Sequence, residues 1–156
     1  MILYHGTNMG FDKIDLSQSR KGKDFGFGFY LTPDKSVATR QAERKYVNNQ
    51  EGVPTVLSYQ WCEDSVSDLN ILRFDSYTLD WAEFILLNRK NKTNQQKHCY
   101  DIVIGPIADD TVGFQIRRLE DGIITMEQFL EEIKYHNVNF QYFFATEKAL
   151  LTLQKI

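Results

Sequence analysis

The segment from Gly22 to Ala42, GKDFGFGFYLTPDKSVATRQA, constrains the fold most, because it places a glycine-rich turn, a short strand and a helix start in direct succession. Gly26 and Gly28 allow the backbone to turn sharply or to approach a ligand closely. Tyr30 follows on the more rigid strand. Such a ring can hold a flat ligand, or it can pack into a core as part of a glycine-aromatic hairpin. The segment alone leaves both interpretations open.

The end of this segment predicts a helix over residues 34–48. We expect Thr32 as its N-cap, Pro33 at its first position and Asp34 at the positive end of its dipole. Its inward face is predicted to carry Val37, Ala38, Gln41, Ala42 and Lys45.

The remaining elements are read from apolar periodicity and capping signals. Strands are expected over residues 1–5, 54–61, 68–74, 100–105 and 140–145, and helices over 76–87, 108–118, 125–135 and 146–153. The expected helix starts are Ser76, Asp109 with Asp110, the capping box of Thr125 and Gln128, and Thr146. Because the strands and helices alternate irregularly, we expect one α+β domain over residues 1–156.

Composition excludes several classes of protein. With 42% apolar and 25% charged residues the chain can build a core, and its net charge of −3 argues against a broad electrostatic grip on nucleic acid. Neither cysteine, Cys62 or Cys99, lies in a CxxC pair. The N-terminus resembles a strand and not a signal peptide, and no segment is long enough for a membrane span, so we expect a cytoplasmic protein.

Other motifs are incomplete. The triplet Asp24-Phe25-Gly26 lacks the other protein-kinase motifs, and Gly26 and Gly28 lack the third glycine of a dinucleotide fingerprint. Histidines and cysteines do not take metal-ligand spacing, so no metal site is expected; they are His5, His98, His136, Cys62 and Cys99.

Three short stretches remain, LYHGTN at the N-terminus, GFGFYLT, and FQYFFAT near the C-terminus. In this order the chain resembles the ADP-ribosyltransferases of the diphtheria-toxin and poly(ADP-ribose) polymerase branch. With YDIVIGPIADD between them, the layout also looks like a little-characterised bacterial family of predicted ADP-ribosyltransferases. The resemblance spans almost the whole chain. It implies a split mixed or antiparallel sheet with flanking helices, holding NAD between its two halves.

The resemblance also implies roles for residues of the first two stretches. His5 would bind a ribose hydroxyl of NAD, Gly6 would present its backbone to the nicotinamide carboxamide, and Thr7 would hold the strand end. Tyr30 would stack on the nicotinamide ring. Arg20, Arg40 and Arg44 are candidates for the diphosphate, because guanidinium groups suit phosphate. Gly28 and Phe29 complete the predicted NAD-binding set.

This sequence departs from the family pattern at the third stretch. Gln141, at the head of the predicted last strand, stands where the wider superfamily usually has glutamate. A carboxylate there would stabilise the positive charge that develops on the ribose as nicotinamide leaves. Gln141 can bind the ribose hydroxyl but offers no charge. Glu147 lies in a first helical turn and is a weak substitute.

Further contacts stay open at this level. The second face of the nicotinamide could stay uncovered or be covered by Phe27 or Phe29, since Tyr46 lies too far along the helix. Arg40 and Arg44 read as solvated surface residues, as does the basic run of Arg89, Lys90, Lys92 and Lys97, although such a run could contact nucleic acid. Asp109 and Asp110 could cap a helix or orient a ribose.

The expected function is that of an NAD-dependent mono-ADP-ribosyltransferase, with His5, Tyr30 and Gln141 as its catalytic residues and a protein or nucleic acid as acceptor. Proteins that share this resemblance are often toxins encoded beside an antitoxin protein, or parts of phage defence. Two alternatives remain. One is a catalytically weak module that binds NAD or ADP-ribose. If the motif match is a coincidence, His5 is a buried structural histidine and Tyr30 is a core ring. The other is an NAD glycohydrolase.

Overall fold

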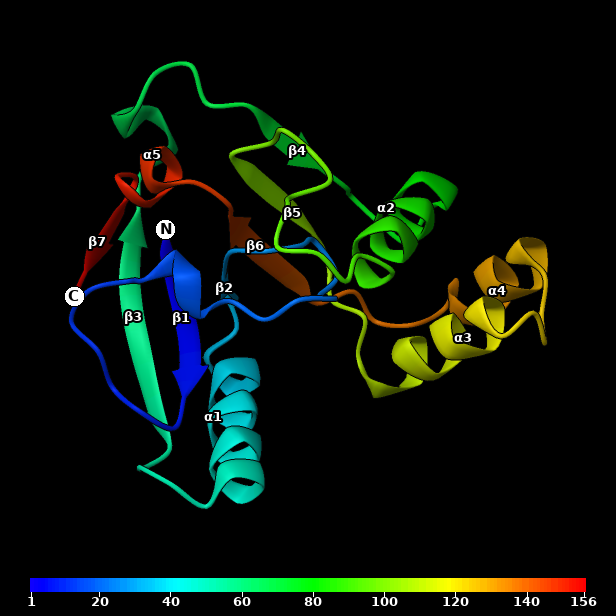
Figure 1. Ribbon diagram of the computed structural model, residues 1–156, viewed down its shortest axis with the longest axis horizontal. Helices are drawn as coiled ribbons and strands as arrows, with labels where there is room; N and C mark the ends of the chain where they lie inside the picture. Colours follow the sequence, from blue (N-terminus) through cyan, green and yellow to red (C-terminus); the bar gives the residue numbers. More distant parts are fainter.

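The computed structural model describes residues 1–156 and contains two β-sheets. The first sheet is antiparallel, in the order β1-β3-β7, with β1 at Ile2–Thr7, β3 at Thr55–Trp61 and β7 at Leu153–Lys155. The second sheet is mixed, in the order β2-β6-β5-β4, with β2 at Phe29–Leu31, β6 at Phe140–Phe144, β5 at Ile102–Pro106 and β4 at Ile71–Arg73. Only β4 and β5 pair in parallel. The expected α+β class is confirmed (Figure 1).

A single bridge joins the two sheets. The Tyr4 N–H donates to the Thr32 carbonyl oxygen at 2.8 Å, and the Thr32 N–H donates to the Tyr4 carbonyl oxygen at 2.9 Å. This pairing places the middle of β1 beside the end of β2. His5 and Tyr30, which are 25 residues apart, therefore meet at the seam between the sheets.

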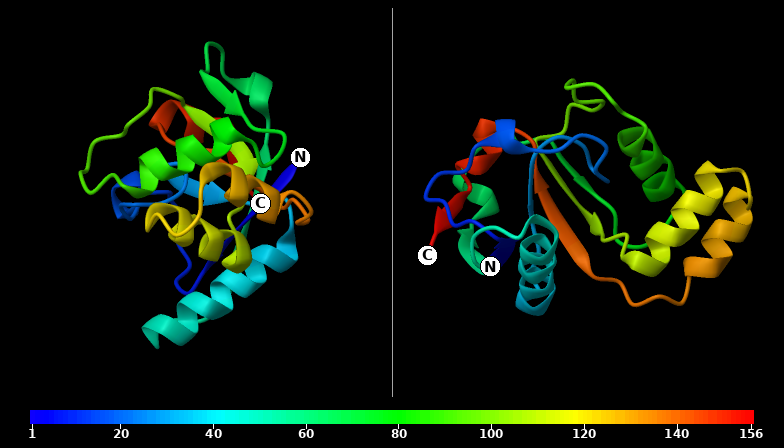
Figure 2. Two further views of the ribbon diagram at one scale, coloured as in Figure 1. Left: turned by 90° about the vertical axis from the view of Figure 1, so that its right-hand side faces the viewer. Right: turned by 60° about the horizontal axis from the view of Figure 1, so that its bottom comes forward.

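The helices flank the sheets (Figures 1 and 2). They are α1 at Lys35–Asn49, α2 at Leu79–Arg89, α3 at Asp110–Glu120, α4 at Met126–Ile133 and α5 at Glu147–Leu150, with short 3-10 turns at Leu16–Gln18 and Glu63–Ser65. Helix α1 packs against β1 so closely that a Cβ on Gly6 would lie 1.9 Å from the Ala38 carbonyl oxygen. Gly6 is thus required by this packing. No helix is long and apolar enough to cross a membrane.

Two hydrophobic clusters support the second sheet from opposite sides. Phe143 and Phe144 are adjacent in β6, and because successive strand residues point to opposite faces, each belongs to a different cluster. Phe143 packs with Trp81 of α2 and Phe129 of α4, among others. Phe144 packs in the cluster that includes Leu3 of β1. The second sheet is therefore buried on both faces, which fixes the position of β6.

Several predicted helix starts are confirmed. Thr125 and Gln128 form the capping box of α4, Asp109 accepts two backbone N–H groups at the start of α3, and Thr146 caps α5. Helix α3 continues through Gly113 without interruption.

Other expectations were wrong. The N-cap of α1 is Asp34, whose carboxylate accepts from the Ser36 N–H at 2.8 Å, because Thr32 is used in the bridge to Tyr4. The N-cap of α2 is Thr78, not Ser76. The predicted final helix ends at Leu150, and β7 follows it, so β6 is not the last strand.

Candidate functional site

Two adjoining cavities form a cleft at the seam between the sheets. The first has a volume of about 560 Å³ and lies under the loop of residues 8–20; the second has about 410 Å³ and reaches Gln141 on β6. Both are of the size that small-molecule ligands occupy. Four side chains line both cavities: His5, Lys23, Tyr30 and Lys45. The predicted residues His5, Tyr30 and Gln141 are thus brought together by the fold.

His5 is held in one orientation by its neighbours. Its Nδ1 lies 2.7 Å from the Tyr30 carbonyl oxygen, and its ring stacks on Phe29 with centroids 4.5 Å apart. Because a carbonyl oxygen can only accept, Nδ1 carries the proton and Nε2 keeps a lone pair directed at the Lys45 ammonium, 3.4 Å away. Burial and the Lys45 charge lower the pKa of His5 to about 3. His5 is therefore a neutral hydrogen-bond acceptor at any physiological pH.

Tyr30 organises the glycine-rich loop as well as lining the cleft. Its hydroxyl donates to the Gly26 carbonyl oxygen at 2.8 Å and accepts from the Phe25 N–H at 3.1 Å. Its ring packs against Phe143 at 4.9 Å between centroids, and the Lys23 ammonium lies 4.8 Å from the ring centre. A ligand that stacks on Tyr30 would have to displace the Lys23 side chain.

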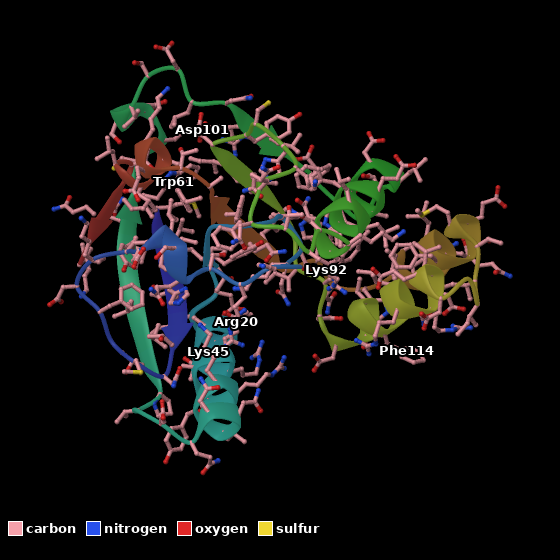
Figure 3. All side chains as sticks on the ribbon, in the orientation of Figure 1. Arg20, Lys45, Trp61, Lys92, Asp101 and Phe114 are labelled. Carbon is pink, nitrogen blue, oxygen red and sulfur yellow. The ribbon has the colours of Figure 1, made fainter.

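The cleft concentrates positive charge. Burial, followed by the charges of Lys23 and Arg20, lowers the pKa of Lys45 from 10.5 to about 8. Burial and the Arg20 charge also lower the pKa of Lys23, whereas the Asp24 carboxylate raises it. The Lys45 ammonium donates to the Gly6 carbonyl oxygen at 2.6 Å. Figure 3 shows Lys45, which belongs to α1, and Arg20 near the same helix. Partly buried cations that repel one another favour an anionic ligand.

Gln141 is buried and lies beside a carboxylate. Its Nε2 is 3.3 Å from the Pro106 carbonyl oxygen and 3.4 Å from Oδ2 of Asp24. The other oxygen of Asp24 accepts from Nε of Arg89 on α2 at 2.7 Å. Asp24 and Arg89 line the second cavity with Gln141.

Of the other predicted NAD-binding residues, Thr7, Arg20, Gly28 and Phe29 line the first cavity, whereas Gly6 lines neither cavity. Thr7 is buried there and exchanges hydrogen bonds with the Met9 backbone, which fixes the end of β1 as expected. Arg20 is exposed at its edge. The Gly28 N–H donates to Ser19 Oγ at 2.8 Å, and a Cβ on Gly28 would lie 2.4 Å from the Phe143 ring. The structure thus gives Gly6 and Gly28 packing roles that the sequence did not reveal.

The structure shows where the residues lie whose contacts with NAD the sequence left undecided. Phe27, Tyr46 and Glu147 do not line either cavity. Phe29 stacks on His5, and Arg40 is an exposed residue 3.3 Å from Ser36 Oγ.

Acidic and basic pairs around the cleft also take definite positions. Asp109 caps α3, and Asp110 forms an exposed ion pair of 3.3 Å with Arg44, which lines the second cavity. Within the basic run, Arg89 is half-buried and forms an ion pair with Asp24. The interpretation of Arg89 as a solvated residue was therefore wrong. Lys90, Lys92 and Lys97 are exposed. No group of three potential metal-ligating side chains occurs.

Sequence reasoning missed Asp24, Lys23 and Arg89 as site residues. Asp24 was visible only as the residue before Phe25-Gly26, and no local pattern joins it to Gln141, 117 residues away. Lys45 gave a detectable signal, because a lysine on the inward face of a helix needs a partner or an anion.

Comparisons with known proteins identify a family. A search of curated proteins and a search of solved structures gave no match. A family model described as "Protein of unknown function (DUF3990)" matches residues 1–155. Since this match covers nearly the whole chain, the protein belongs to the DUF3990 family.

Proposed function

We propose that this protein is an NAD-dependent mono-ADP-ribosyltransferase. One observation carries the proposal: His5, Tyr30 and Gln141, the residues singled out by the resemblance, line one cleft that also gathers Arg20, Lys23 and Lys45. NAD combines two phosphates with a flat cationic ring and two riboses. The cleft offers cations for the phosphates, an aromatic ring and neutral hydrogen-bonding side chains.

Each side chain has a task that follows from its surroundings. His5 Nε2 accepts a hydrogen bond from a ribose hydroxyl once the Lys45 ammonium moves from it onto a phosphate. Movement of Lys23 in the same direction uncovers the Tyr30 ring for the nicotinamide. The two lysines thereby exchange mutual repulsion for attraction to the diphosphate.

In the proposed reaction the bond between nicotinamide and ribose C1′ breaks, and its electron pair leaves with nicotinamide. The ribose then carries positive charge until a nucleophile of the acceptor bonds to C1′ and releases its proton to water. Tyr30 positions the leaving ring, and Gln141 orients the ribose. A site whose polar groups are already oriented lowers the barrier to such a step.

The test is nicotinamide release from NAD, with and without cell extract, for the wild type, His5→Ala and Gln141→Ala. The proposal expects release that depends on extract and that falls at least about 100-fold in both variants, the scale found when a single oriented polar group is removed. Thermal unfolding of each variant controls for folding. Absence of release by the wild type with extract from several bacteria would refute the transferase.

One observation favours a binding module as the second candidate. Gln141 carries no charge, and its amide already meets Pro106 and Asp24, as a structural glutamine would. NAD binding that is lost in His5→Ala, without release under any condition, would support this module. Release that is rapid without extract would indicate an NAD glycohydrolase.

We also propose a role as a toxin with a neutralising partner protein. Its test is growth of a bacterium that expresses the wild type or His5→Ala from an inducible promoter. Growth arrest by the wild type alone supports the role, and equal growth of both strains, with equal protein levels, contradicts it.

A further inference from the structure

The second cavity contains one carboxylate, Asp24, among several cationic side chains. Gln141 leaves the site without the negative charge that an oxocarbenium-like ribose calls for. The acid that could provide this charge must lie near Gln141 and face the cavity. Asp24 meets both requirements, because its Oδ2 is 3.4 Å from Gln141 Nε2 and it lines the same cavity.

Asp24 is held firmly in this place. Its Oδ1 accepts from Arg89 Nε at 2.7 Å, and its side chain is 15% exposed. The loop that carries it is fixed on the next two residues, since the Tyr30 hydroxyl bonds the Phe25 N–H and the Gly26 carbonyl oxygen. Gly26 has a φ of 100°, a left-handed conformation that favours glycine. One carboxylate oxygen is thus anchored, and the other is directed toward Gln141.

We propose that Asp24, acting beside Gln141, supplies the negative charge that stabilises the ribose cation during cleavage of NAD. This inference rests on the proposed function. Gln141 binds the ribose hydroxyl and aligns the sugar, while the Asp24 carboxylate faces C1′ as the electron pair of the C1′–nitrogen bond leaves with nicotinamide. Asp24 exchanges no proton; the acceptor's proton passes to water when the new bond to C1′ forms.

The charge of Asp24 reaches the other groups of the cleft. Burial raises the pKa of Tyr30 well above 10, and the Asp24 carboxylate adds to this effect, whereas Arg89 opposes it. At the Tyr30 hydroxyl the effect of the Asp24 charge on the pKa is therefore larger than the opposing effect of Arg89. A carboxylate at this position would favour the positive charge that develops on the ribose as nicotinamide leaves.

The test removes this charge and then restores it from the neighbouring residue. Asp24→Asn keeps the shape and an acceptor for Arg89 but loses the charge. Gln141→Glu in the Asp24→Asn background returns a carboxylate to the same corner of the cavity. Glu63→Gln is the matched control, because Glu63 is also paired with an arginine, Arg73, but lies outside the cleft.

Initial rates of nicotinamide release and dissociation constants for ADP-ribose are measured for all four proteins. We expect Asp24→Asn to lower kcat about 100-fold while the NAD KM changes less than about 3-fold, because the charge acts on the transition state. The double variant should recover at least about 10-fold of the loss. Glu63→Gln should match the wild type. A purely structural role would lower the melting temperature without selective loss of kcat or rescue.

The outcomes separate this inference from the proposed function. Wild-type kcat in Asp24→Asn overturns the role of Asp24 and leaves the transferase intact. A loss in Asp24→Asn that the double variant fails to recover, with ADP-ribose binding and melting temperature unchanged, also overturns it. A wild type that neither binds ADP-ribose nor releases nicotinamide overturns both.

Discussion

Lys45→Met should make the protein more stable and weaken its binding of ADP-ribose. In the folded protein burial and the charges of Lys23 and Arg20 disfavour the charged Lys45 side chain. A pKa of about 8 in place of 10.5 corresponds to about 3 kcal/mol of free energy at pH 7. Because Lys45 is partly exposed, solvent reduces this value. Methionine removes the charge and keeps an unbranched side chain that is one atom shorter.

The hydrogen bond from Lys45 to the Gly6 carbonyl oxygen opposes this gain. Its loss removes about 1–2 kcal/mol, so we expect a net stabilisation of about 1 kcal/mol. For a domain of this size that corresponds to a melting temperature higher by about 2–4 °C. Binding changes in the opposite direction, because a charge-assisted hydrogen bond to phosphate contributes about 1.5–3 kcal/mol, so the ADP-ribose dissociation constant should rise at least about 10-fold.

The pH dependence of the wild type provides a second readout of the same group. The unfolded chain keeps the Lys45 proton up to pH 10.5, whereas the folded protein releases it near pH 8. The free energy of unfolding therefore increases as the pH rises from 8 toward 10.5, because only the unfolded chain still binds the Lys45 proton in this range. ADP-ribose affinity should fall over the rise from pH 7 to 9, and Lys45→Arg should remove this dependence. His5, with a pKa of about 3, adds no step in this range.

Calorimetric titration with ADP-ribose and thermal unfolding at pH 7, 8 and 9 measure both effects without turnover. A Lys45→Met variant that is less stable than the wild type and binds ADP-ribose equally well would refute the assignment of Lys45 to an anion site. It would show that Lys45 serves the fold through the Gly6 carbonyl alone.

Three further predictions concern packing and loop order. Gly6→Ala should lower the free energy of unfolding by about 3 kcal/mol or more, because its Cβ would meet the Ala38 carbonyl oxygen at 1.9 Å; Gly10→Ala, with open space around it, is the control in thermal unfolding, and equal effects would contradict the helix contact. Gly113→Ala should stabilise α3 by about 0.5–1 kcal/mol, since the nearest atoms to an added Cβ lie 4.0 Å away. A lower melting temperature of this variant would contradict the prediction. Tyr30→Phe should destabilise by about 1–2 kcal/mol and raise the NAD KM, because the hydroxyl bonds two loop backbone groups; unchanged urea unfolding and KM would argue against the loop-holding role.

Local signals in the sequence identified much of the fold. The Thr125–Gln128 capping box and the Asp109 cap depend on residues within one helical turn, so they can be read directly. Thr32 and Asp34 are both good caps, and the choice between them is made by Tyr4, which pairs with Thr32 from a distant strand. The strand β7 has three residues and exists through its pairing with β3, which no local pattern encodes.

In the candidate site, too, some residues could be predicted from local motifs and others depend on contacts between distant segments. The family resemblance of the two N-terminal motifs predicted that His5 and Tyr30 share one site, and the fold brings both into the cleft. The contact between Asp24 and Gln141 arises because the glycine-rich loop folds over the head of β6, where Tyr30, Arg89 and Gln96 hold it. Convergence of segments more than 60 residues apart is a tertiary property.

Transfer of the ADP-ribose group tests the central claim most directly. The protein is incubated with cell extract and NAD that carries ³²P in its adenylate phosphate, and the label in macromolecules is counted for the wild type and His5→Ala. We predict label in discrete protein or nucleic-acid species with the wild type, none with His5→Ala, and none with NAD labelled in its nicotinamide. Absence of label with a folded wild type that binds ADP-ribose would contradict the transferase and leave the binding module or the NAD glycohydrolase.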